Sequence, residues 1–288
     1  MTTITHSASY SGRLFCSPLK VFSSAWNQRT LILRLARREI EARYRGSVLG
    51  IAWSLIVPLV LLAVYTFVFS IIFKARWDMP IEGEGAFAGK GVFALVLFTG
   101  LILFNVFAEC VTRAPSLMLD RPGYIKKVVF PLETFAWVTV VVALFNAAVS
   151  SAALLIGYLL LVGLPPLSAL TFPLMVIPLV LLALGLTWFL SSVGVYLRDM
   201  QQFVPVLVTI AMFMSPIFYP KEALPPAALA LTELNPLAVV IEAGRWTLFP
   251  GELPDWTVLT LHFFLAWLVA WLGFMWFNKT RKGFADVV

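Results

Sequence analysis

Long runs of apolar residues limit the fold of this chain more than any other feature. A helix needs about 20 apolar residues to cross a hydrocarbon core of roughly 30 Å, because it rises about 1.5 Å per residue. Six segments of the 288-residue chain meet or approach this requirement, near residues 51–73, 92–112, 134–162, 170–194, 203–220 and 256–278. With 60% hydrophobic and 12% charged residues, the chain is too apolar for a water-soluble globule. The sequence predicts an all-α integral membrane protein with six transmembrane helices within residues 49–288.

The positive charges indicate how these helices are oriented. An even number of spans places both termini on one side of the membrane, and 16 of the 21 Lys and Arg residues fall on that side. Since cytoplasmic loops are enriched in Lys and Arg, we expect both termini in the cytoplasm. Orientation in the bilayer therefore accounts for the net charge of +6, and we expect no nucleic-acid partner.

The N-terminal region divides into two parts. Residues 1–25 are polar, rich in Ser and Thr and without the apolar core of a signal peptide, and we expect them to be disordered. Residues 26–48 predict an amphipathic interfacial helix on the membrane lipids, with an ordinary solvated helix as the alternative. Its charged residues gather on one arc of the helical wheel, namely Arg34, Arg37, Arg38, Glu41 and Arg45. Glu39 and Arg43 interrupt the apolar side and are spaced for a local ion pair.

Sequence signatures of an enzyme are missing. The two histidines lie far apart, and no cluster of His, Cys and carboxylate residues has metal-ligand spacing. The stretch GEGAFAGKG at 83–91 departs from the Walker pattern, because its glycine spacing differs and glycine follows its lysine. Glu109 lies inside a predicted span, and we expect it to pair with Arg113 four residues later. We therefore expect no catalytic residue, metal or cofactor in this chain.

Aromatic residues make up 14% of the chain. Many are expected to pack between helices or to sit at the headgroup level, which Trp and Tyr favour. As a group, their rings can also stack on the C–H faces of sugars without holding any one sugar tightly, which suits a long polymer. The candidate residues for such a polysaccharide channel are Trp53, Tyr65, Phe69 and Trp137.

Small residues recur in two predicted spans, at Ala143, Ala147 and Ser151 in the third and at Gly185, Ser192 and Gly194 in the fourth. Small side chains let the backbones of neighbouring helices approach closely. We expect helix contacts at these positions.

Two loops are more apolar than ordinary connections. The stretch LNPLAVVIEAGRWTLFP at 234–250 has apolar residues at helical spacing but is too short to span, which predicts a re-entrant or interfacial hairpin or a helix on the bundle rim. In RPGYIKKVVFPLE at 121–133, prolines limit any helix to short pieces, and apolar residues accompany the lysines. A simple cytoplasmic loop would need only the lysines. We expect this segment to contact lipid headgroups or a protein partner.

Four stretches together resemble a known family. They are RREIEARYRGSVLGIAWSLIVPL at 37–59, YIKKVVFPLE at 124–133, VYLRDMQQFVPVLVTIAMFMSPIFYP at 195–220 and LNPLAVVIEAGRW at 234–246. In this order they are similar to the membrane subunit of ABC exporters for polysaccharides, the branch that includes O-antigen, capsule and teichoic-acid permeases. The N-terminal 25 residues resemble nothing in that family.

The resemblance implies a permease of the bacterial inner membrane that pairs with a second copy of itself and with two copies of a cytoplasmic nucleotide-binding ATPase subunit. ATP and magnesium would bind to that partner, and the cargo would be a lipid-linked polysaccharide. Residues 224–248 would form outward re-entrant helices before the last span. The resemblance also implies a cytoplasmic coupling helix, with the ATPase-coupling residues Arg121, Tyr124, Ile125, Lys126, Lys127, Val128, Phe130 and Glu133.

Two other classes of membrane protein are the alternatives. A multispanning enzyme of glycan or lipid assembly would need a constellation of carboxylates or histidines at one membrane face, and none is evident in the sequence. An ion channel would need charged or carbonyl-rich filter sequences, which are also not evident.

Overall fold

The computed structural model describes residues 20–72, 88–126 and 130–287, and every element within these ranges is helical. In the labels used below, α marks α-helices and η marks 3₁₀-helices, except η2, which is a π-helix. The elements up to the centre of the chain are α1 (Lys20–Asn27), α2 (Arg29–Tyr44), η1 (Gly50–Ala52), α3 (Trp53–Thr66), η2 (Phe67–Ile72), α4 (Ala88–Arg113), η3 (Ala114–Ser116), α5 (Pro122–Lys126) and α6 (Thr134–Leu161). They are followed by η4 (Leu167–Thr171), α7 (Phe172–Tyr196), α8 (Met200–Met214), η5 (Lys221–Ala223), α9 (Pro226–Glu233), α10 (Pro236–Leu248), α11 (Trp256–Thr280), η6 (Arg281–Gly283) and α12 (Phe284–Val287).

Four helices of the described ranges are long and apolar enough to cross a membrane. They are Gly91–Ser116, Thr134–Leu161, Leu167–Tyr196 and Trp256–Val287. These four match the second, third, fourth and sixth predicted spans. The first and fifth predicted spans contain shorter apolar helices, α3 with 14 residues and α8 with 15.

Local sequence explains where several of these helices begin and end. The residue before a proline favours an extended backbone, and α8 ends where Ser215 adopts that conformation before Pro216. The side chain of Asn235 accepts a hydrogen bond from the backbone N–H of Leu237 and caps α10, which then starts with a proline. Asp255 caps α11 in the same way. The sequence between α8 and α11 therefore forms two short α-helices, α9 and α10, after the 3₁₀-helix η5, rather than one long helix.

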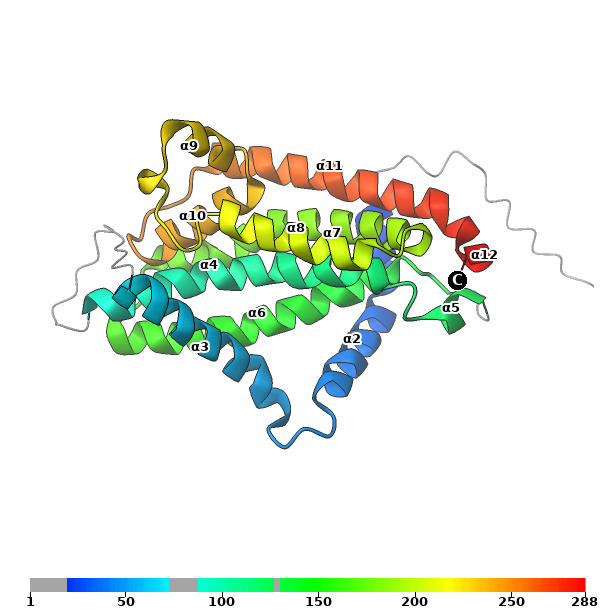
Figure 1. Cartoon of the computed structure of the whole chain (residues 1–288), viewed down its shortest axis with the longest axis horizontal. Coiled ribbons are helices and arrows are strands. Elements are labelled where there is room, and N and C mark those ends of the chain that lie inside the picture. Colours follow the sequence, from blue (N-terminus) through cyan, green and yellow to red (C-terminus); the bar gives the residue numbers. More distant parts are fainter. Residues whose placement is uncertain (1–19, 73–87, 127–129, 288) are drawn as a thin grey trace, which may run out of the picture.

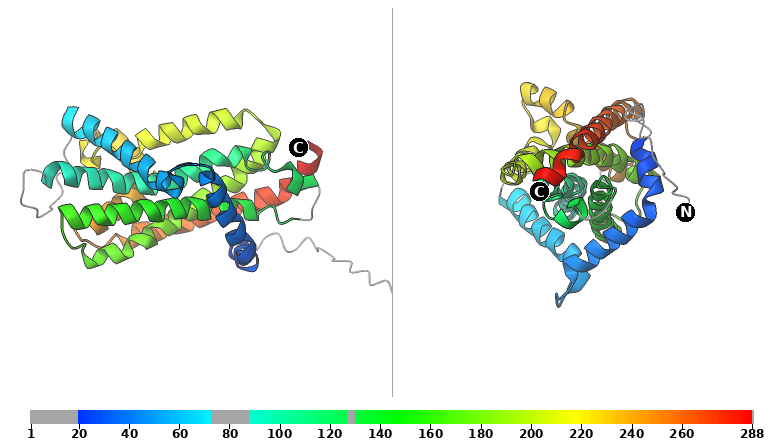
Figure 2. Two further views of the ribbon diagram at one scale, coloured as in Figure 1. Left: turned by 90° about the horizontal axis from the view of Figure 1, so that it is seen from below. Right: turned by 90° about the vertical axis from the view of Figure 1, so that its right-hand side faces the viewer.

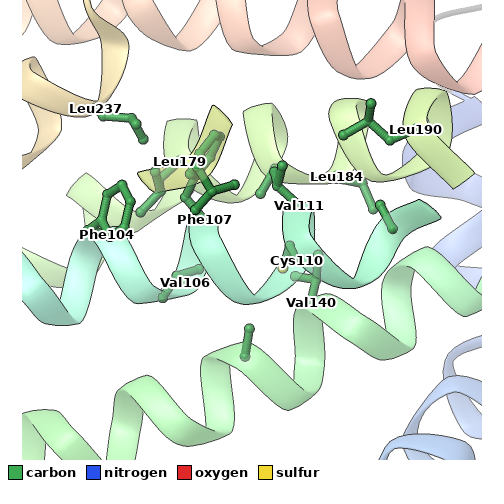
Figure 3. Packing of buried hydrophobic residues seen from close by; sticks show 14 of the residues in the cluster. Phe104, Val106, Phe107, Cys110, Val111, Val140, Leu179, Leu184, Leu190 and Leu237 are labelled. Carbon is green, nitrogen blue, oxygen red and sulfur yellow. The ribbon is translucent and has the colours of Figure 1, made fainter. Parts of the chain in front are cut away.

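The central element of the bundle is α4, which packs against α3, α6, α7, α8 and α10. Of the 18-residue apolar stretch by which α4 qualifies as a membrane span, 72% is buried inside the structure. The corresponding stretches of α6 and α11 are each 28% buried. Figure 3 shows Phe107 and Val111 of α4 pointing towards α7, while Cys110 faces Val140 of α6. Because other helices enclose α4, a movement of any of them alters its packing contacts with α4.

Glycines allow the closest helix contacts, as the small-residue pattern predicts at Gly185 and Gly194. A Cβ atom added to Gly185 of α7 would lie 2.5 Å from the carbonyl oxygen of Val269 in α11, and one added to Gly273 would overlap Gly185 itself. At Gly194, an added Cβ would overlap the backbone of Pro115 in η3. These contacts fix α7 against both α11 and the segment that follows α4.

The two ends of the bundle carry different elements. Figure 1 shows α5 and α12 at one end, here called the α5 end, and α9 and α10 towards the other, here called the α9 end. Helices α2 and α3 diverge from a turn that projects away from the bundle, and in the end-on view of Figure 2 they form a V that flanks the bundle on two adjoining sides. The N-terminus predicted to be disordered lies outside the described residues up to position 19, and α1 covers residues 20–27.

Candidate functional site

The coupling segment predicted at 121–133 forms the short helix α5 and a return to α6 at the α5 end; Lys127 and Val128 lie outside the described residues. The rings of Tyr124 and Phe130 lie 4.8 Å apart, and both contact Phe135 of α6, at 5.4 and 5.0 Å. Ile125 packs on the same buried core. Tyr124, Ile125 and Phe130, which the sequence suggested would contact lipid headgroups or a partner, are therefore half-buried against the protein itself, and Phe135 of α6 covers the two rings.

The tip of α5 presents a different surface. Pro122, Gly123 and Lys126 are exposed, and a Cβ atom added to Gly123 would meet nothing within 4 Å. The half-buried rings thus anchor the segment, while this tip is free to contact another molecule.

Two charged residues attach the coupling segment to distant elements. The Arg121 guanidinium donates to the Glu39 carboxylate of α2 at 2.8 Å and to the carbonyl oxygen of Leu117 at 3.1 Å, and it lies 4.7 Å from the centre of the Phe135 ring. At the other end of the segment, the Glu133 carboxylate accepts a hydrogen bond from Arg281 of η6 at 2.9 Å. The segment is therefore held from two sides.

Helix α2 is amphipathic as predicted, but its apolar side faces the protein. Its charged arc is exposed, comprising Arg34, Arg37, Arg38 and Glu41, and Arg45 just after the helix is exposed as well. Ile32 and Ala36 are buried against Val138 and Val142 of α6. The predicted lipid-facing side is thus largely a helix–helix contact.

The two charged residues on the inner side of α2 reach other helices. Glu39 pairs with Arg113 and Arg121, and Arg43 pairs with Glu109 of α4. The sequence predicted a local pair between Glu39 and Arg43, but spacing along one helix does not reveal partners 66 to 82 residues away. The local pair predicted between Glu109 and Arg113 is confirmed at 3.8 Å.

Beside these ion pairs lies a cavity of about 560 Å³, here called the polar cavity. Its lining combines apolar side chains with Arg43, Trp53, Ser54, Asn105, Glu109, Thr112, Arg113, Asn146 and Ser150, contributed by α2, α3, α4 and α6. Asn146 of α6 donates to the Glu109 carboxylate at 2.8 Å. Hydroxyl, amide and indole groups of this kind bind sugar hydroxyls and ring faces.

The aromatics predicted to line a channel do not gather at one site. Trp53 lines the polar cavity, is 42% exposed and donates from Nε1 to the hydroxyl of Ser47 at 3.0 Å. Tyr65 lies further along α3 and packs edge-on against Phe218 at 5.0 Å. Trp137 packs edge-on against Trp188 of α7 instead of lining the polar cavity, and the side chain of Phe69 lies outside the described residues.

A second charged site, which the sequence did not single out, lies at the α9 end. The side chain of Arg245 in α10 is completely buried, and its guanidinium donates to the carbonyl oxygens of Val96, Pro216 and Ile217 and to Glu242. Burial lowers the pKa of Arg245 to about 10, which still leaves it protonated at neutral pH. The only signal in the sequence is Glu242, one helical turn earlier in a mostly apolar stretch.

Gly100 of α4 makes room for this side chain. A Cβ atom added to Gly100 would lie 2.6 Å from Nη2 of Arg245. Arg245 thus ties α10 to the central helix α4 and to the segment after α8.

Within the described residues, no group of three or more His, Cys, Asp or Glu side chains is placed to hold a metal ion. What the structure offers is an anchored tip at one end, a polar cavity beside the ion pairs that join α2 to α4, and a buried arginine that ties α10 to α4 at the other end. These features belong to a helical protein with several helices that are long and apolar enough to cross a membrane.

Comparison with known proteins identifies the family. The model of the ABC-2 type transporter family matches residues 30–249, so the chain belongs to that family of transporter membrane subunits. It is 26% identical over 272 residues to the O-antigen export system permease protein RfbA of Myxococcus xanthus, covering 94% of this chain and 100% of that protein. A Klebsiella pneumoniae protein of the same name is 24% identical, covering 90% and 95%. The polysialic acid transport protein KpsM of Escherichia coli is 24% identical, covering 79% and 84%.

Proposed function

We propose that this chain is the membrane permease subunit of an ABC exporter that moves a lipid-linked polysaccharide, of the O-antigen or capsule type, out of the cytoplasm. The observation that carries the proposal is the match along nearly the whole chain to export permeases for such polymers. A separate ATPase subunit binds ATP and magnesium and supplies the energy. The permease acts as a pair of copies with two ATPase subunits in the bacterial inner membrane.

In this proposal the chain crosses the membrane six times. Helix α3 continues directly into η2, so that residues 53–72 form one helical stretch of roughly the length that a bilayer needs. Helix α8 with the turn and bend at residues 215–219 forms the fifth crossing, and α9 and α10 are outward re-entrant helices. The α5 end then faces the cytoplasm, as the excess of Lys and Arg in its segments favours.

The tip of α5 is the docking point for the ATPase. Its neighbours Tyr124 and Phe130 are packed on α6, so force applied to the tip is passed to a spanning helix. A partner surface that encloses Pro122, Gly123 and Lys126 would bury a small exposed knob without disturbing the rings beneath it.

The polar cavity is where the glycan is first held. It opens beside α3, whose apolar side chains, among them Val57, Val60 and Val64, are exposed in the single chain. Exposed apolar area of this extent on a helix fits lipid or a second copy of the chain. A cavity that offers amide, hydroxyl and indole groups binds sugars by many weak contacts, which permits release and forward movement.

The docking role of α5 is tested by Gly123→Trp. The open space around Gly123 lets the chain fold with a large side chain there, while the indole would collide with a docked partner. We expect the purified permease to retain roughly tenfold less of its partner ATPase, which corresponds to about 1.4 kcal/mol of binding free energy.

The matched control is Leu164→Trp, which adds an indole at a residue that is 89% exposed and follows α6 on the opposite side of the span from α5. It should retain the ATPase fully. Full retention by Gly123→Trp would contradict docking at α5.

A further inference from the structure

We propose that Glu39 is the positioning residue that links the coupling segment to helix α2 and, through α2, to the polar cavity. This inference rests on the proposed function and adds how movement at the ATPase reaches the glycan. The group formed by Glu39, Arg113 and Arg121 is here called the charged hub.

The charged hub joins three elements through one carboxylate. Oε1 of Glu39 accepts from Arg113 at the end of α4, and Oε2 accepts from Arg121 at the start of the coupling segment, at 2.8 Å. The side chain of Glu39 is only 17% exposed, and that of Arg121 is 21% exposed. Ion pairs sheltered from water are screened less than surface pairs, and a carboxylate that binds two guanidiniums is fixed in direction.

Arg121 is a stiff connection between Glu39 and the coupling segment. Its Nη1 donates to the carbonyl oxygen of Leu117, and its guanidinium lies over the ring of Phe135. The same ring contacts Tyr124 and Phe130, which anchor α5. A displacement of α5 therefore moves the guanidinium that Glu39 binds.

One helical turn further along α2, Arg43 carries the connection to the polar cavity. Arg43 pairs with Glu109, and Asn146 of α6 holds the other oxygen of that carboxylate. Arg43, Glu109 and Asn146 all line the polar cavity. Because residues 39 and 43 lie on one rigid helix, a tilt imposed at Glu39 changes the position of Arg43 in the cavity wall.

The same helix provides a matched control. Glu41 pairs with Arg37 on α2 itself, at 2.8 Å, and their side chains are 64% and 83% exposed. Exposed pairs within one helix contribute little and connect α2 to no other element. Glu41→Gln and Glu39→Gln remove the same charge from the same helix, and only Glu39→Gln cuts the proposed link.

The experiment uses the full complex of permease and partner ATPase in proteoliposomes with a lipid-linked glycan. Three quantities are measured for wild type, Glu39→Gln and Glu41→Gln: recovery of the ATPase with the permease, basal ATP hydrolysis, and glycan-stimulated hydrolysis together with transport. For Glu39→Gln we expect normal recovery and basal hydrolysis but a roughly tenfold loss of stimulation and transport, within the usual range of coupling between sites. Glu41→Gln should match wild type.

A double-mutant cycle with Arg121→Gln tests whether the contact itself transmits the movement. If the pair is the link, the double variant should be no worse than the more affected single variant. Glu39→Asp is a second probe that keeps the charge but shortens the side chain, so that it no longer reaches both guanidiniums. It should lose stimulation as well, and it covers the case in which Glu39→Gln does not fold.

Three results would overturn the inference. The first is transport by Glu39→Gln equal to that of Glu41→Gln. The second is loss of ATPase recovery in Glu39→Gln, which would make Glu39 part of the docking surface. The third is additive effects of Glu39→Gln and Arg121→Gln in the double-mutant cycle. A wild-type complex that shows no response to lipid-linked glycan would instead contradict the proposed function, so the two failures are distinguishable.

Discussion

Replacing Arg245 with Met is the perturbation whose effect the structure defines most fully. The methionine side chain fills part of the same space but donates no hydrogen bond. Glu242 would lose its cationic partner at 3.1 Å, and the carbonyl oxygens of Pro216 and Ile217 would lose the donors that the Arg245 guanidinium supplies.

The expected cost follows from these contacts. Removing one member of a buried ion pair costs roughly 3–5 kcal/mol, and each orphaned buried acceptor adds to this. Relaxation of the chain, which lets water or protons reach Glu242, offsets part of the sum. We therefore expect a loss of about 4 kcal/mol in stability. At roughly 2–4 °C per kcal/mol for a chain near this size, the melting temperature falls by roughly 10 °C.

Thermal unfolding of the detergent-purified complex, followed by size-exclusion chromatography of heated samples, measures this shift. Arg198→Met is the control, because Arg198 lies on an exposed turn between α7 and α8. Gly100→Ala should give a smaller loss, roughly 1–3 kcal/mol, because the added methyl group crowds a guanidinium that is held in place. A melting temperature for Arg245→Met within 2–3 °C of wild type, a change of roughly 1 kcal/mol, would refute the reasoning.

Three further predictions concern packing, the cavity and orientation. Gly273→Ala forces α11 away from Gly185 of α7 and should lower the melting temperature. Gly123→Ala should not, because Gly123 has open space around it, and equal melting temperatures of the two variants would contradict the close contact between α7 and α11. Trp53→Ala should reduce glycan-stimulated ATP hydrolysis several-fold, whereas Trp276→Ala, at a tryptophan of similar exposure on α11, should leave it unchanged. Normal stimulation in both variants would show that Trp53 does not contact the glycan. In a chain without its natural cysteines, a cysteine at Lys126 should react with an impermeant label only from the cytoplasmic side and one at Leu164 only from outside, and the reverse pattern would invert the proposed orientation.

The spanning helices could be predicted closely from the sequence because a membrane imposes a length and an apolar composition on each of them. The predicted span 134–162 and the helix Thr134–Leu161 differ by one residue. The short helix α8 differs more from its predicted span, because a proline sets its end. Apolar length and proline act on the residues next to them, so their effects on a helix can be read from a short stretch of sequence.

The charged contacts between helices could not be predicted in the same way. Glu39 meets Arg121 across 82 residues, and Arg245 reaches Val96 across 149, and no spacing rule relates such positions. Similarly, the apolar residues of 121–133 are conspicuous in the sequence, but only the fold reveals that α6 covers Tyr124 and Phe130 and leaves Gly123 exposed. Tertiary packing decides which member of an apolar segment faces outward.

The most direct test of the account is reconstitution of this chain into proteoliposomes with and without its partner ATPase, with the outward movement of a lipid-linked glycan measured in each. We predict that the chain alone neither hydrolyses ATP nor moves the glycan against its gradient. With the ATPase and ATP present, movement and hydrolysis should appear together. ATP hydrolysis or uphill glycan movement by the chain alone would contradict the conclusion that it is a permease driven by a separate subunit.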